Sequence, residues 1–109
     1  MCIRDSDSVI QGRENIRAAL LTRPKTLLTK HLATNVMVDV VSRDEASALS
    51  YLTMISTTPG AGASEPYISV GPVYFGEIKD KFVREDGTWK IWQRRGSIQM
   101  KFFGSQAPA

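Results

Sequence analysis

The stretch FVREDGTWKIWQRRG, residues 82–96, decides how this chain folds. Apolar and polar residues alternate on both sides of Asp86 and Gly87. This alternation predicts one strand over Val73–Arg84 and another over Thr88–Phe103. Asp-Gly between two alternating runs is a strong signal for a tight turn, because both residue types accept a positive φ. The C-terminal part of the chain is therefore predicted to be an antiparallel hairpin.

A second hairpin and a helix are predicted upstream. The run Leu28–Val41 alternates β-branched with other residues, and Ala46–Thr58 follows it after the polar turn Ser42–Asp44. Earlier still, Gly12–Leu21 places its apolar residues at helical spacing. Pro24 ends this helix because the residue before a proline is forced out of the helical region. The fold class is α+β, a short helix followed by a four-stranded curved antiparallel sheet.

Both faces of this sheet carry apolar side chains. In the second predicted strand, Leu52 and Met54 lie on one face, and Tyr51 and Ile55 lie on the other. One helix of about ten residues cannot cover two faces of a long sheet. We therefore expect further copies of the chain, as in a homo-oligomer, or a preceding segment to cover the rest.

Composition excludes several classes of protein. The 109 residues suit one domain, and the net charge of +3 comes from basic residues that acidic ones interrupt, which argues against nucleic-acid binding. No apolar run reaches the length of a membrane span, and no signal peptide is recognisable, so a cytoplasmic protein without membrane contact is expected. One cysteine and one histidine give no basis for a metal site, and no cofactor is expected.

The first six residues, MCIRDS, resemble the translation of a transposon-end adapter used to prepare sequencing libraries. We therefore expect residues 1–6 to be adapter-derived, residues 7–103 to form a partial domain and residues 104–109 to form a disordered tail. On this interpretation the natural coding sequence begins further upstream.

The chain resembles the SnoaL-like branch of the nuclear-transport-factor-2-like superfamily in three segments. These are TKHLATNVMVDVV (29–41), SYLTMIS (50–56) and FVREDGTWKIWQRRG (82–96). Its scytalone dehydratase-like and bile-acid dehydratase-like members are the most similar. The resemblance implies a cone-shaped α+β barrel, in which two helices, a short strand pair and a third helix precede four long strands around a pocket. This chain would be the C-terminal part of that barrel, starting at the third helix, with the first helices and first strands absent.

The resemblance implies a cofactor-independent dehydratase, polyketide cyclase or isomerase, hence a lyase or isomerase if the protein is an enzyme. His31 matches a pocket histidine of the family, which can take and return protons near neutral pH. In relatives an aspartate on the first helix pairs with it, and this chain has no counterpart of that aspartate. From the residues alone, a single histidine near the start of a strand is more often a hydrogen-bonded structural residue.

Further positions match the pocket wall of scytalone dehydratase, and most of them are apolar, which suits a small hydrophobic ligand. These expected substrate-binding residues are Leu52, Met54, Ser56, Tyr74, Ile78, Arg94 and Ile98.

Some of these positions depart from the enzyme or have two interpretations. Ser56 replaces a second pocket histidine, and Gly76 and Ile78 replace a serine and an asparagine, so the same reaction is not expected. Arg94 either holds an enolate or carboxylate, or forms an ion pair with Asp80 or Glu77.

Tyr74 either donates a hydrogen bond to a ligand or packs as an ordinary strand aromatic. The alternative for the whole chain is a noncatalytic ligand-binding or dimerisation module, such as the small subunit of a ring-hydroxylating dioxygenase.

Overall fold

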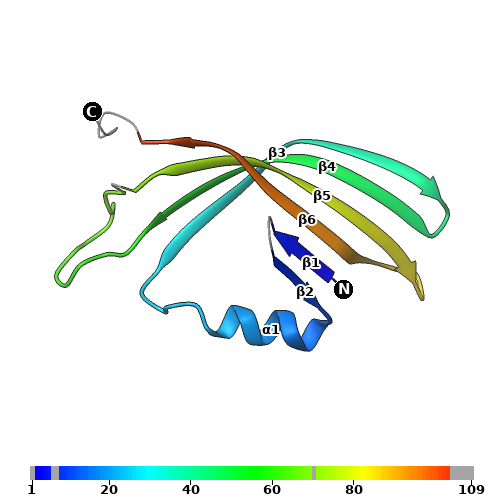
Figure 1. The fold of residues 1–109 in the computed structure, drawn as a ribbon, viewed down its shortest axis with the longest axis horizontal. Coiled ribbons are helices and arrows are strands. Elements are labelled where there is room, and N and C mark those ends of the chain that lie inside the picture. Colours follow the sequence, from blue (N-terminus) through cyan, green and yellow to red (C-terminus); the bar gives the residue numbers. More distant parts are fainter. Residues whose placement is uncertain (1, 6–7, 70, 104–109) are drawn as a thin grey trace.

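The computed structural model describes residues 2–5, 8–69 and 71–103. Two short strands and a helix precede four long strands (Figure 1). In chain order the elements are β1 (Cys2–Asp5), β2 (Ser8–Gln11), α1 (Arg13–Leu21), β3 (Leu28–Ser42), β4 (Glu45–Thr57), β5 (Val73–Glu85) and β6 (Thr88–Phe102). All six strands form one sheet in the order β2-β1-β6-β5-β4-β3, antiparallel throughout except where β1 runs parallel to β6.

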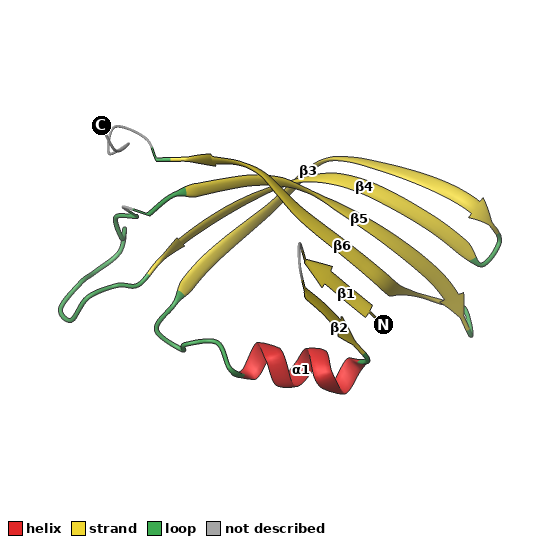
Figure 2. Cartoon of the chain, in the orientation of Figure 1, coloured by secondary structure: helices red, strands yellow, loops and turns green. Residues whose placement is uncertain are grey.

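The predicted α+β class is confirmed. The helix and the four long antiparallel strands begin and end within one residue of the positions expected from the sequence (Figure 2). The Asp-Gly turn between β5 and β6 has a φ of 51° at Asp86 and 78° at Gly87, the positive values that this tight hairpin turn requires.

The expectation that the first strands are absent is wrong. β1 and β2 form a hairpin before α1, and β1 pairs with β6, so that Ile3 lies beside Arg94. Strands of four residues are too short to show a clear alternation, and the partner of β1 is far away in the sequence. The predicted adapter origin of residues 1–6 stays a prediction, and the tail at 104–109 lies outside the described residues.

Irregularities in the sheet change which side chains share a face. In β3, Thr34 pairs with Tyr51 and Met37 with Leu49, so Asn35 and the residue after it lie opposite Ser50 alone. This is a β-bulge, and Asn35 takes a φ of 52°, which asparagine tolerates better than most residues. A second register shift lies in β6, where Ile98 and Met100 pair with consecutive residues of β5.

The curved sheet has a convex side and a concave side, and α1 lies across from the concave side (Figure 1). Within the described residues, α1 contacts β1 and β2 but none of the four long strands. Among the described apolar side chains, Ile16 of α1 and Leu52 of β4 are buried. The concave face of the long strands is therefore largely uncovered. Of the described elements α1 is the one helix, and its nine residues are too few to cross a membrane.

Candidate functional site

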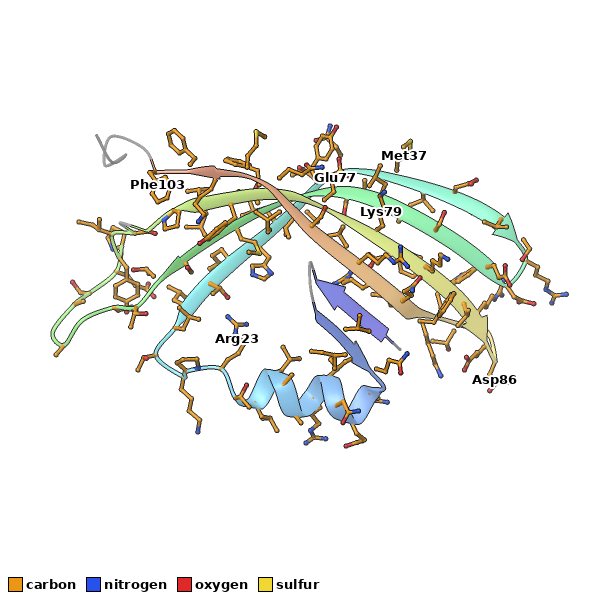
Figure 3. The ribbon with its side chains drawn as sticks, in the orientation of Figure 1. Arg23, Met37, Glu77, Lys79, Asp86 and Phe103 are labelled. Atoms are coloured by element: carbon orange, nitrogen blue, oxygen red, sulfur yellow. The ribbon has the colours of Figure 1, made fainter. Side chains whose placement is uncertain are left out.

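One hydrogen bond identifies which side chains face inward. Arg23, in the linker between α1 and β3, extends into the concave side of the sheet (Figure 3). Its Nη2 donates to Oγ1 of Thr29 at 3.0 Å, so Thr29 faces the concave side. Side chains two residues apart on a strand share a face, and His31 therefore also faces the concave side.

Strand pairing extends this face across the sheet. His31 pairs with Met54, Met54 pairs with Tyr74, and Tyr74 pairs with Lys101. Residues directly opposite one another in an antiparallel sheet lie on the same face, so these four side chains form one row. The Lys101 ammonium lies 5.3 Å from the centre of the Tyr74 ring, within the range of a cation–π contact.

The other predicted pocket positions lie on the same face. Leu52 pairs with Gly76, which pairs with Ile98, and Ser56 pairs with Thr29 at the open end of the sheet. Ile78 follows Gly76 by two residues on β5. Leu52 is buried, whereas Ile98 is 38% exposed. These expected substrate-binding residues therefore lie on one surface of the sheet.

The ion pair predicted as one interpretation of Arg94 is present. Its Nε and Nη2 donate to the two carboxylate oxygens of Asp80 at 2.7 and 3.0 Å. The Asp80 side chain is 8% exposed and that of Arg94 is 41% exposed. The hydrogen bond from Arg94 to Asp80 raises the pKa of the guanidinium, against a smaller opposing effect of burial. Arg94 is therefore held in place, with part of its guanidinium still accessible from the concave side.

His31 has no carboxylate partner among the described side chains. No described acidic oxygen lies within 4.0 Å of its ring, and no described side chain forms a hydrogen bond with it. The imidazole is exposed. Within the described residues, no three histidine, cysteine or acidic side chains come together as a metal site.

Two cations near the row that contains His31, Arg23 and Lys101, were not predicted from the sequence. Arg23 lies in a loop, where no periodicity indicates the direction of a side chain. Lys101 was missed because strict alternation along β6 would place Met100, and not Lys101, beside Ile98. The register shift between them reverses this, since Met100 pairs with Phe75 and Lys101 with Tyr74.

The convex face is also apolar. Met37 lies on it (Figure 3), and this side chain is 64% exposed. A shallow hollow of about 500 Å³ lies over β4, β5 and β6, where Tyr51, Phe75 and Met100 contribute to its wall. The two tryptophans lie on opposite faces. Trp89 pairs with Arg84 of the concave face, and Trp92 lies against Lys81.

Comparison with known proteins identifies the family. The model of the SnoaL-like domain matches residues 3–95, most of the chain. No curated protein gives a significant sequence match. Several solved structures have a similar fold. The three described next are less than 25% identical to this chain in sequence, so their similarity concerns the fold alone.

Three of these structures illustrate the range of the fold. A candidate scytalone dehydratase from Novosphingobium aromaticivorans is 22% identical with a TM-score of 0.70, over 99% of this chain and 69% of its own. A type 2 hexachlorocyclohexane dehydrochlorinase, LinA, is 15% identical with a TM-score of 0.76, over 99% of this chain and 70% of its own. ActVI-ORFA from Streptomyces coelicolor is 20% identical with a TM-score of 0.66, over 90% and 73%.

The family match and the fold agree with each other. The matched residues include β2, α1, β3, β4, β5 and about half of β6, and the long strands among them form the concave surface described above. The chain therefore belongs to the SnoaL-like domain family and has the α+β fold of the nuclear-transport-factor-2-like superfamily, which includes dehydratases and cyclases.

Proposed function

We propose that this domain acts on a small hydrophobic substrate by acid/base chemistry at His31, as a cofactor-independent dehydratase, cyclase or isomerase. The observation that carries the proposal is the row His31, Met54 and Tyr74 on the concave face, beside the apolar Leu52 and Ile98. A histidine beside an apolar surface can reach a proton of a bound ligand while the wall holds the ligand's carbon skeleton.

For a β-hydroxy ketone the proposed elimination balances within the site. The neutral imidazole of His31 removes a proton from the carbon next to the carbonyl, and the resulting electron pair forms the carbon–carbon double bond. The carbon–oxygen bond breaks, and the departing hydroxyl takes the proton from the imidazolium to leave as water. The Tyr74 hydroxyl, two strands across from His31, is proposed to donate a hydrogen bond to the enolate oxygen while its charge develops.

The test uses a neutral aromatic substrate, 4-hydroxy-4-phenylbutan-2-one. Formation of the conjugated ketone is followed by absorbance, and exchange of the α-protons in D₂O is followed by NMR. His31→Gln should lower both rates about 100-fold or more, the usual contribution of a general acid/base. Lys30→Gln, one residue away on the opposite face of β3, should leave both rates unchanged.

Equal rates for the parent chain and His31→Gln would contradict the proposal. Binding of the ketone without elimination or exchange would favour a noncatalytic ligand-binding module, the alternative expected from the sequence.

We also propose that copies of the chain associate through the convex face, as a homo-oligomer. Met37 and Tyr51 of this face are 64% and 51% exposed. Tyr51 pairs with Glu77, and Leu49, beside Met37, pairs with Lys79, so acidic and basic groups adjoin the apolar side chains. A two-fold contact places such a face against itself, which allows the acid of one copy to meet the base of the other. The cytoplasmic location expected from the sequence stays a prediction.

A further inference from the structure

Acidic residues are distributed unevenly between the two faces of the long strands. The acidic residues Asp39, Glu45, Glu77 and Glu85 alternate with concave-facing positions and so lie on the convex face. The acid on the concave side of these strands is Asp80, and Arg94 already neutralises it. Arg84 and Lys101 are concave-facing cations, and both lie against aromatic rings. The concave face of the described strands is therefore positively charged as well as apolar.

Arg23 differs from these other cations. It comes from the α1–β3 linker rather than from a strand, and it extends over the end of the sheet where Thr29 and Ser56 pair (Figure 3). Its described contact is a single hydrogen bond to the neutral Thr29 hydroxyl, and no described carboxylate lies within 4.0 Å of it. A guanidinium has five donors in a planar fork and stays charged at all working pH values. Most of these donors are therefore available to a ligand.

The position of Arg23 relative to His31 defines what such a ligand would look like. Thr29, which holds Arg23, precedes His31 by two residues on β3, so their Cα atoms are about 7 Å apart. Ser56 adds a hydroxyl opposite Thr29, and Met54 adds apolar surface opposite His31. A molecule with its reacting carbon at His31 would thus have its far end within reach of Arg23.

We propose that Arg23 is a specificity-determining residue that binds a carboxylate of the ligand, so that the substrate is an apolar molecule with a carboxylate end. A guanidinium recognises a carboxylate by two parallel hydrogen bonds, and the Thr29 hydroxyl orients the guanidinium for this contact. This inference rests on the proposed function, because it assumes that the ligand lies on the same concave face as His31.

The experiment compares two probes of nearly equal shape, 2-naphthoate and its neutral methyl ester, by titration calorimetry of the whole chain at low salt. The parent chain should bind naphthoate about tenfold more tightly than the ester, a preference that added salt reduces. Arg23→Gln should abolish most of this preference and leave the affinity for the ester unchanged. Arg13→Gln, the same change of charge on exposed α1, should keep the preference.

Each remaining outcome is decisive. If both probes bind and Arg23→Gln alters neither affinity, the proposal for Arg23 is overturned while the concave ligand site stands. If Lys101→Gln, and not Arg23→Gln, removes the preference, the carboxylate binds beside β6 on the concave face instead of beside β3. The proposal for Arg23 is then also overturned. If neither probe binds the parent chain, the proposed function falls together with the inference. Circular dichroism of each variant confirms that the strands are retained.

Discussion

Arg94 is a residue whose two interpretations the structure separates. Its guanidinium forms two hydrogen bonds with the nearly buried Asp80, so its first role is to neutralise that carboxylate. A held guanidinium is also a better donor to a ligand than a mobile one, because less side-chain freedom is lost on binding. Asp80 lies six residues from Tyr74 on β5, about 20 Å along the strand, so the paired Arg94 can bind a separate polar group of a ligand but not the enolate at His31.

Asp80→Asn should lower the free energy of unfolding by about 1–2 kcal/mol, measured by urea denaturation, because it removes one member of a charged, partly buried pair. Since the ion pair raises the pKa of Arg94, its stabilisation through Arg94 is complete below the unfolded pKa and is lost only as the pH rises through the folded value, in strong alkali. The part of the loss in free energy of unfolding of Asp80→Asn that arises through Arg94 should then be constant between about pH 6 and pH 9.

The control for this experiment is Asp39→Asn, the same substitution at an exposed position of β3, which should change the stability by less than about 0.5 kcal/mol. An Asp80→Asn chain with the same denaturation midpoint as the parent would show that the ion pair contributes nothing.

Alternation along the sequence assigned the faces correctly as far as the pairing stayed regular. His31, Met54 and Tyr74 share a face because no bulge interrupts the strands between them. It failed at Lys101, beyond the register shift in β6, because a single extra residue reverses the direction of every later side chain. Asn35 marks another such point by its positive φ.

At the scale of the elements, the pairing of β5 with β6 depends on Gly76. A Cβ at Gly76 would overlap the backbone carbonyl of Ser97 on β6. The neighbouring strand therefore comes too close for any larger residue.

Gly76→Ala should accordingly destabilise the chain by about 1–3 kcal/mol, the usual cost of forcing extra atoms into a closely packed position. The thermal midpoint and the urea midpoint should both fall. Gly60→Ala is the matched control, because nothing lies within 4 Å of a Cβ built there. A Gly76→Ala chain as stable as the control would mean that β6 moves away from β5 at little cost.

The elements that the sequence did predict are those with enough residues to show a period. β3 and β6 have 15 residues each, whereas β1 and β2 have four each. The two short strands are stabilised by pairing with each other and by the pairing of β1 with β6. Short strands owe their conformation to their neighbours, so a single sequence contains little signal for them.

As a whole molecule, the chain is an open shell. Its radius of gyration is 16.8 Å, compared with about 13 Å for a compact domain of this length. Few of its described apolar side chains are buried, and much of both sheet faces is accessible. An exposed surface of this kind favours association with other molecules.

The 109-residue chain should therefore self-associate in a concentration-dependent manner, measured by size-exclusion chromatography with light scattering. Met37→Glu places a charge in the convex face and should shift the distribution toward smaller species. Leu21→Glu, an equally drastic change at an exposed position of α1, should not. A parent chain that remains a monodisperse monomer at high concentration would contradict this expectation.

The bulge at Asn35 has a consequence for how β3 meets other chains. β3 is the last strand of the sheet order, so one edge of its backbone is unpaired within the described chain. A straight edge of 15 residues would be a template on which a foreign strand could extend by hydrogen bonding along its full length. Asn35 turns the backbone out of register partway along, and an added strand can follow the edge on one side of that point only. The same residue that shifts the sheet register inside the molecule thus limits the growth of intermolecular β-structure outside it.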